Sequence, residues 1–209
     1  MATIVRAPDQ RVLLDNITWD TYESLLVAHR DRSVPRFTYD RGQLEIMSPS
    51  DEHEQLKETT TLLVNIAAEE LHINLEGFGS TTFRREDIAR GFEPDACFYV
   101  ASLMRVKGNV ELDLRADPPP DLVIEFDVTR SSLDKLGVFA HVGVPEVWRY
   151  DGRRLNILCL QGLEYREQVE SMALRGPFSR DVSRFLDQSR TLERLEWLRQ
   201  VRAWARPRR

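Results

Sequence analysis

The sequence is poor in the features that mark several large classes of protein. Its 209 residues include only two cysteines, Cys97 and Cys159, with neither a CxxC pair nor a Cys/His spacing typical of zinc sites. We expect both thiols to be small buried side chains in a reducing compartment. No apolar run approaches the roughly 18 residues that a membrane span needs, and the N-terminus lacks a basic patch followed by an apolar stretch. The sequence therefore predicts a soluble, cytoplasmic protein.

Lysine is also scarce, and positive charge is not in excess. The chain has 29 basic and 34 acidic residues and a formal net charge of -5, so bulk charge does not hold it to a polyanion. Of the basic residues, 26 are arginines, and the only lysines are Lys57, Lys107 and Lys135. A lysine that stands beside acidic residues in this chain is therefore a candidate for a chemical role.

The spacing of apolar residues predicts short strands with helices at both ends of the chain. Residues 1–17 form a leading segment, and helical spacing follows at about 18–30, 49–72, 131–141, 181–188 and 191–205. Strands are indicated at 35–40, 43–47, 80–84, 95–100, 121–128, 146–150, 155–160 and 164–168. The absence of repeats and low-complexity linkers favours one α/β domain.

The strand expected at 121–128, DLVIEFDV, carries two acids on one face. Side chains alternate across a strand, so Val123, Glu125 and Asp127 point the same way. The two carboxylates stand about 6.6 Å apart at the backbone, and we expect them to repel. A charge in so hydrophobic a strand needs a bound cation or an ion-pair partner. Two alternatives stay open: a metal site, or one acid paired with an arginine and the other at the solvent-exposed end of the strand.

A second acidic position opens the strand at 95–100. In Glu93-Pro94-Asp95 the last acid follows a proline at the strand start, where an acid is often only a turn residue. Together with Glu125 it acquires a reason, because Mg²⁺ prefers oxygen ligands and takes one or two carboxylates while keeping several waters. We therefore expect adjacent strands to bring Asp95 and Glu125 together as ligands of Mg²⁺ or Mn²⁺.

Two helices are expected to complete this site. Lys135 lies in the first turn of the helix that follows the acidic strand, and its stem can reach back over the strand end. There its ammonium would stabilise charge on a phosphate, or orient and activate a water; the alternative is an ordinary surface lysine. His53 stands at the N-terminal end of the inward stripe of the helix at 49–72, with Glu54 on the flank. We expect His53 to face the same site.

Taken in order, these residues resemble a known nuclease pattern. A Pro-Asp dipeptide opening a strand, a hydrophobic strand ending in an acidic pair, and a helix with lysine resemble the PD-(D/E)XK nuclease superfamily. A closer resemblance, over about residues 30–170, is to the Uma-two family of restriction-endonuclease type. It is carried by DRGQLEIMSPSDEHEQL, FGSTTFRRED, GFEPDACFYV and PPPDLVIEFDVTRSSLDKLGVFAHVGVPEVWRYD. The resemblance implies a restriction-endonuclease-like mixed β-sheet core flanked by helices over 31–170. The chain would add an N-terminal helical extension, 1–30, and a C-terminal one, 171–209, packed on the same domain.

The resemblance also implies roles for the candidate residues. Asp95 and Glu125 match the metal-ligating acids, and His53 matches a histidine at the start of the first long helix. The superfamily lysine usually stands two residues after the second acid, where this chain has Asp127, and Lys135 on the next helix takes its place. Asp127 is then a third metal ligand, an orienter of Lys135, or neither. Glu54 corresponds to a helical glutamate that some superfamily nucleases add to the metal shell. The expected catalytic set is Asp95, Glu125, Lys135, Asp127 and His53.

The implied activity is metal-assisted hydrolysis of phosphodiester bonds in nucleic acid, with DNA as the expected substrate. Arg84, Arg85 and Arg130 are expected to contact phosphates locally despite the negative net charge. An alternative is a non-catalytic nucleic-acid-binding or assembly module that retains the fold. A glycosidase with paired carboxylates has less support, because the short chain lacks the signature of an aromatic-lined cleft.

The last expected helix has more apolar surface than a terminal surface helix needs. Its stripe consists of Leu192, Leu195, Leu198 and Val201, with Trp197 and Trp204 beside it. We therefore expect a homodimer that uses this stripe. No small-molecule cofactor is expected.

Overall fold

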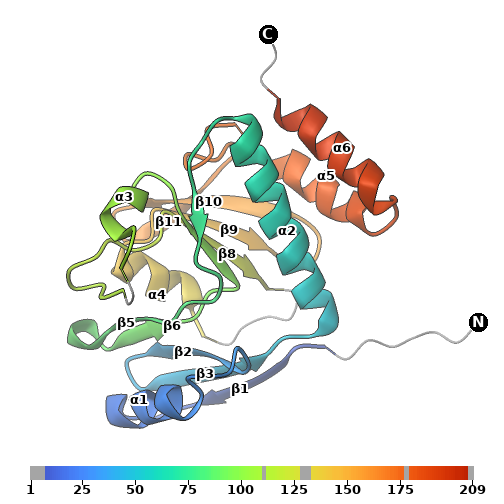
Figure 1. Cartoon of the computed structure of the whole chain (residues 1–209). Coiled ribbons are helices and arrows are strands. Elements are labelled where there is room, and N and C mark those ends of the chain that lie inside the picture. The colour runs from blue at the N-terminus through green and yellow to red at the C-terminus, as the bar shows by residue number, and fades with distance from the viewer. Residues whose placement is uncertain (1–7, 110–111, 128–132, 177–178, 207–209) are drawn as a thin grey trace, which may run out of the picture.

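Two β-sheets and the helices between and around them make up the fold (Figure 1). The computed structural model describes residues 8–109, 112–127, 133–176 and 179–206. Its elements are, in chain order, β1 (Gln10–Leu14), α1 (Trp19–Ala28), β2 (Arg36–Asp40), β3 (Gln43–Ser48), α2 (Asp51–Glu70), β4 (Glu76–Gly77), β5 (Phe83–Arg85), a 3₁₀ turn (Glu86–Ile88), β6 (Arg90–Phe92), β7 (Ala96–Tyr99), α3 (Leu103–Val106), β8 (Leu122–Phe126), α4 (Lys135–Val142), β9 (Glu146–Tyr150), β10 (Leu155–Gln161), β11 (Glu164–Gln168), α5 (Ser179–Ser189) and α6 (Arg194–Ala205). The expected α/β class is confirmed.

The two sheets differ in topology. The sheet with strand order β1-β3-β2-β6-β5, here called the N-terminal sheet, is antiparallel throughout. The other, here called the central sheet, has the order β11-β10-β9-β8-β7-β4 and is mixed, because β8 and β9 are parallel. Helix α4 makes the crossover between these two parallel strands, as a parallel connection requires. The mixed sheet was expected from the sequence, whereas the separate N-terminal sheet was not.

Helices and sheets alternate as layers (Figure 1). Helix α1 covers the outer face of the N-terminal sheet, where Tyr22 stacks on Tyr39 with ring centroids 4.9 Å apart. Helix α4 lies between the two sheets, and its Phe139 meets Phe92 of β6 edge to face at 4.8 Å. Helices α2, α5 and α6 cover the far face of the central sheet. Helix α4 therefore fills part of the space between the two sheets.

Strand β8 sends its side chains alternately to these two cores. Leu122, Ile124 and Phe126 belong to the core under α2, α5 and α6. Val123 belongs to the core around α4, so Glu125 points to that side as well. The alternation expected from the sequence is confirmed, and it places the Glu125 carboxylate between the two sheets.

Strand β1 is the clearest addition to the sequence-based assignment. It lies within the leading segment 1–17, forms the edge of the N-terminal sheet and pairs with β3 from Gln10↔Ser48 to Leu14↔Leu44. Its residues alternate between exposed and half-buried, and Val12 is 53% exposed. An edge strand without a buried face has no apolar alternation to reveal it. The N-terminal extension therefore contributes a strand as well as the expected helix.

Other boundaries shift by a few residues. The strand expected at 80–84 shortens to β5, and the short elements β4, β6 and α3 were not expected. The helix expected at 131–141 runs over Lys135–Val142, with Asp134 accepting a hydrogen bond from Gly137 N–H at 3.1 Å as its cap. Residues 131 and 132 lie outside the described residues.

Two absences in the sequence have counterparts in the structure. Among the described residues, no helix has both the length and the apolar character to cross a membrane. Both cysteines are free and buried, as expected. Burial raises the thiol pKa of Cys97 to about 12 and that of Cys159 to about 11, so both stay neutral.

The apolar stripe of α6 packs inside its own chain. Trp197 and Val201 are fully buried against α2 and α5, and the Trp204 ring lies 5.2 Å from that of Phe185. Of the stripe, Leu195 is 60% exposed, whereas Leu192 and Leu198 pack against the same core. Using this stripe to infer a homodimer was wrong, because helical periodicity marks an apolar face without saying what covers it. The homodimer stays a prediction without that support.

Substituting the buried and the exposed members of α6 tests this packing. Trp197→Ala removes a fully buried indole whose Nε1 donates to the Phe185 carbonyl at 2.8 Å, and should cost about 3–5 kcal/mol of unfolding free energy. Leu195→Ala, at an exposed position of the same helix, should change it by about 0.5 kcal/mol or less. Urea unfolding followed by circular dichroism measures both. Equal losses would contradict the packing of α6 described here.

Candidate active site

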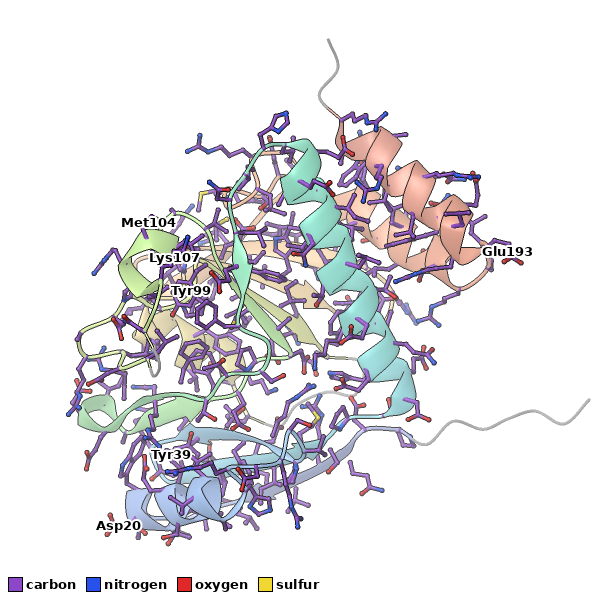
Figure 2. All side chains as sticks on the ribbon, viewed as in Figure 1. Asp20, Tyr39, Tyr99, Met104, Lys107 and Glu193 are labelled. Carbon is purple, nitrogen blue, oxygen red and sulfur yellow. The ribbon has the colours of Figure 1, made fainter. Side chains whose placement is uncertain are left out.

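Charged side chains from both sheets and two helices meet at one buried place. The central sheet supplies Asp95, just before β7, and Glu125 of β8, while α2 supplies His53 and α4 supplies Lys135. Asp95 and His53 are each 1% exposed and Glu125 is 6% exposed. Figure 2 shows side chains between the N-terminal sheet and the central sheet. The structure thus brings together four of the residues that the sequence assigned to one site: Asp95, Glu125, His53 and Lys135.

Asp95 accepts hydrogen bonds on both carboxylate oxygens. Its Oδ1 lies 2.8 Å from His53 Nε2 and also accepts from the guanidinium of Arg36, a buried residue of β2. Its Oδ2 accepts from the backbone N–H of Phe126 at 2.7 Å. A buried carboxylate with three donors needs no solvent to remain charged.

His53 lies between two carboxylates. Its Nδ1 is 3.1 Å from Asp9 Oδ2, on the opposite side of the ring from Asp95. Burial disfavours the charged imidazole, but the hydrogen bonds with Asp9 and Asp95 outweigh it and raise the pKa of His53 to about 9. Burial would raise the pKa of Asp95, but His53 first, and then Arg36 and Lys135, hold that pKa below its ordinary value. At neutral pH the histidine is therefore a cation and the aspartate an anion.

Glu125 forms a buried ion pair with Lys135. Lys135 Nζ donates to Glu125 Oε2 at 2.9 Å, and the backbone N–H of Asp95 donates to Oε1 at 3.3 Å. Burial raises the pKa of Glu125, the Asp95 charge adds to that effect, and Lys135 opposes it. Burial would lower the pKa of Lys135, but Glu125, Asp95 and Glu45 raise it above its ordinary value. The lysine stem reaches back over the end of β8, as expected.

These contacts close into a ring of charges. Lys135 Nζ lies 3.7 Å from Glu45 Oε1 on β3, which accepts from Arg11 of β1 at 2.9 Å. Arg11 Nη2 in turn lies 3.7 Å from Asp9 Oδ2. The charge ring therefore consists of Asp9, His53, Asp95, Glu125, Lys135, Glu45 and Arg11. Each base in it lies between two acids.

Glu125 and Asp127, which were expected to repel each other, are each paired with a cation. Each acid has its own cation, Lys135 for Glu125 and Arg149 for Asp127, whose Oδ2 lies 2.5 Å from Arg149 Nη2. Ion pairing, which the sequence left open for one of the two acids, is therefore present at both positions. Asp127 lies at the rim of the site, beside the charge ring.

The remaining candidates have other surroundings. Glu54 is half-buried and pairs with Arg36 and with Lys57, the latter at 3.2 Å. Arg84 and Arg85 lie on β5, an edge of the N-terminal sheet, where their partners are Glu23 at 3.0 Å and Asp87 at 2.6 Å. The structure does not bring these two arginines to the charge ring. Arg130 lies outside the described residues.

Sequence reasoning missed Asp9, Arg11, Arg36 and Glu45. A signal existed for Glu45: it is an acid in the middle of an apolar strand, as Glu125 is, and it is 2% exposed. Asp9 and Arg11 stand in a segment with no predicted structure. All four come from the N-terminal sheet or from the residue before it. The docking of this sheet against the central sheet has no local sequence pattern that predicts it.

The chain is similar to a known protein family. The chain matches the profile of the Uma2 family, described as "Putative restriction endonuclease", over residues 19–192. The chain belongs to this family. The match confirms the resemblance carried by the sequence blocks, and it includes every ring residue except Asp9 and Arg11. No curated protein matches this Uma2 chain.

A solved structure supports the fold of this Uma2 protein. The crystal structure of a protein from Anabaena variabilis ATCC 29413, described as a "putative nuclease", superposes with a TM-score of 0.59. The two chains are 17% identical, and the match covers 81% of this chain and 99% of that one. At this identity the likeness concerns the fold alone, and it confirms the expected nuclease-like α/β architecture.

Asp95 and Glu125 of this Uma2 protein fit a magnesium or manganese ion in their chemistry. Among the described residues, no group of three or more His, Cys, Asp and Glu side chains is arranged to hold a metal ion. A Mg²⁺ site needs only one or two carboxylates, however, because waters supply its other ligands. Asp95 and Glu125 supply two buried carboxylates, and the Glu125 carboxylate accepts from the backbone N–H of Asp95 at 3.3 Å. In the structure their oxygens accept from Arg36, His53 and Lys135, which a metal would have to share or displace.

The histidine of the charge ring makes the stability of the protein depend on pH. Because the folded-state pKa of His53 is raised to about 9, its stabilising contribution is complete below its unfolded value of about 6.5 and is lost as pH rises through about 9. His53→Gln should remove roughly 3 kcal/mol more at pH 6 than at pH 9.5. Urea unfolding at both pH values measures the difference.

The matched control is His141→Gln, at an exposed histidine in the last turn of α4. It should keep the wild-type change of stability between these pH values. A loss of stability in His53→Gln that is the same at both would contradict the charged state assigned to His53.

Proposed function

We propose that this Uma2 protein hydrolyses phosphodiester bonds of nucleic acid, with DNA as the expected substrate and Mg²⁺ or Mn²⁺ as the expected cofactor. The observation that carries the proposal is the buried meeting of Asp95, Glu125 and Lys135, with Lys135 Nζ 2.9 Å from Glu125. Two adjacent carboxylates and one ammonium supply the metal ligands and the positive charge that phosphodiester hydrolysis requires. Membership in a family described as "Putative restriction endonuclease" supports the same reaction.

Lys135 acts in this proposal as a fixed positive charge. Its pKa is raised by Glu125, Asp95 and Glu45, so the ammonium keeps its protons at neutral pH. It therefore stabilises negative charge that develops on the phosphate, and does not withdraw a proton from water. This narrows the roles that the sequence allowed for it.

His53 and Arg36 act on Asp95. Both donate to its Oδ1 from opposite elements, α2 and β2, so the carboxylate is held in one orientation and in its charged form. Since His53 is itself a cation between two acids, it orients Asp95 and is not a general base. When bound by Asp95 and Glu125, Mg²⁺ or Mn²⁺ would lower the pKa of a water and neutralise charge on the phosphate.

A second candidate function is nucleic-acid binding without hydrolysis. One observation favours it: the acids of the ring are already paired with the protein's own cations, His53, Arg36, Lys135 and Arg11. With Arg36 added, four cations face the four acids of the ring, and such a balanced cluster can serve as a structural core that needs no metal. Cleavage and metal binding decide between the two functions.

Cleavage should require Lys135 and a divalent cation. We expect the purified protein to cut DNA with Mg²⁺ or Mn²⁺ when offered single-stranded, duplex and branched substrates, and EDTA to stop the reaction. Lys135→Met should lower the rate by about 10²–10³-fold, and Glu125→Gln should abolish cleavage. Lys107→Met, at an exposed lysine at the end of α3 (Figure 2), should cut as the wild type does. Cleavage that survives in Lys135→Met and Glu125→Gln belongs to a contaminant and contradicts the proposal.

Metal binding should stabilise the wild-type protein and depend on both acids. At a Mn²⁺ concentration about 100 times the dissociation constant, binding adds about 2.7 kcal/mol of unfolding free energy, which differential scanning fluorimetry detects as a rise in Tm. Asp95→Asn and Glu125→Gln should lose this rise.

Glu146→Gln is the matched control for a buried carboxylate. Glu146 lies on β9, is 1% exposed, and accepts from Trp148 and Ser171 at 2.6 Å each and from Met172 N–H at 2.8 Å. Whatever stability this substitution costs, the rise in Tm with Mn²⁺ should remain. A wild-type protein that Mn²⁺ does not stabilise would favour the binding function without hydrolysis.

A further inference from the structure

A small cavity opens beside the charge ring. Its volume is about 80 Å³, and its walls include Glu125, Lys135, Arg11, Asp127 and Arg149. Pockets that enclose a whole small molecule are far larger, about 300–1,000 Å³. This cavity therefore has room for a group of the size of a phosphate and not for a nucleoside.

Cations from three elements face this cavity: Arg11 from β1, Lys135 from α4 and Arg149 from β9. Arg11 and Lys135 have side chains only 12% exposed, and both belong to the ring. The Arg149 side chain is 40% exposed. Of the three, Arg149 is thus the one that an incoming strand of nucleic acid meets first.

The position of Arg149 is fixed by the sheet and by one acid. In the parallel pairing of β8 with β9, Arg149 stands opposite Glu125, so both side chains leave the same face of the central sheet. Its Nη2 donates to Asp127 Oδ2 at 2.5 Å, and the Asp127 side chain is 13% exposed. The more buried acid holds the guanidinium in place, while the more open guanidinium has further N–H donors to offer.

We infer that Arg149, oriented by Asp127, binds a backbone phosphate of the nucleic acid at the mouth of this cavity. The inference rests on the proposed function and adds to it a residue that binds the substrate. A guanidinium presents a planar fork that matches two oxygens of a phosphate. Because the cavity admits the backbone and not a base, the contact is independent of sequence.

This inference gives Asp127 a role different from that of a metal ligand. Asp127 is a positioning residue that acts through Arg149, and its position two residues after Glu125 places it under the β9 arginine. Asp127→Asn should therefore keep the Mn²⁺-induced rise in Tm that Glu125→Gln loses. Loss of that rise in Asp127→Asn would return Asp127 to the metal site and overturn this part of the inference.

Binding measured without cleavage tests the role of Arg149. Fluorescence anisotropy with labelled phosphorothioate DNA, single-stranded and duplex, in EDTA gives Kd between about 50 and 200 mM salt. Arg149→Ala should weaken binding roughly tenfold at the lowest salt. It should also reduce the slope of log Kd against log salt by about 0.9 for duplex and about 0.7 for single strands. Arg149→Lys, which keeps the charge but not the fork, should recover part of the affinity and most of the slope.

Arg154→Ala is the matched control. Arg154 precedes β10, is 63% exposed and pairs with one acid, Glu167, at 3.4 Å, but it does not line the cavity. It should leave affinity and slope unchanged. If Arg149→Ala binds as the wild type does, if Arg154→Ala weakens binding equally, or if the wild type binds neither DNA at low salt, the inference is overturned.

The same set of proteins separates this inference from the proposed function. In cleavage assays Arg149→Ala should raise KM with little change in kcat, because it binds substrate without touching the reacting atoms. DNA binding that depends on Arg149 in a protein that does not cut would leave the phosphate contact standing and defeat the nuclease proposal. Cleavage that does not depend on Arg149 would support the nuclease proposal and contradict the phosphate contact.

Discussion

The rest of the site depends on the burial of the Glu125–Lys135 ion pair between two sheets. A buried acid or base without its partner costs several kcal/mol, so each charge placed there requires the next. Following these requirements from Glu125 leads to Lys135, then Glu45, Arg11, Asp9, His53 and Asp95, and so back to the Asp95 N–H that binds Glu125. The positions of β1, β3, α2 and α4 around the end of β8 are those that complete this sequence of pairs.

The sequence predicted the half of the site that local patterns encode. Asp95, Glu125 and Lys135 stand at a strand start, in the middle of a strand and in the first turn of a helix, and periodicity of two or of 3.6 residues places each of them. His53 follows from the stripe of α2 in the same way. Local patterns also predicted strands β7 to β11 and helix α4, but neither β4 nor the order of the strands in the central sheet.

The other half depends on how the N-terminal sheet docks, and that has no local signature. Arg36 and Glu45 lie on strands that were predicted, yet nothing in their spacing says that they face β8 and α4. The homodimer interface inferred from the apolar stripe around Trp197 was wrong for a related reason. An apolar helix face can be recognised in the sequence, but the element that covers it cannot. Arg84 and Arg85 lie on an edge strand turned to other acids. Long-range docking thus decides both which ring residues the sequence missed and which elements cover the apolar stripe of α6.

The first strand of the chain has a consequence for how the protein folds. Asp9 and Arg11 join groups as distant in sequence as His53 and Glu45, so the ring consists of contacts of high sequence separation. Such contacts form late, because the entropy of closing long loops must be met before they add stability. A partly folded chain with β1 undocked leaves Glu45 and His53 each short of one partner, and water must solvate them. We therefore expect the docking of β1 to complete the site and the native fold together.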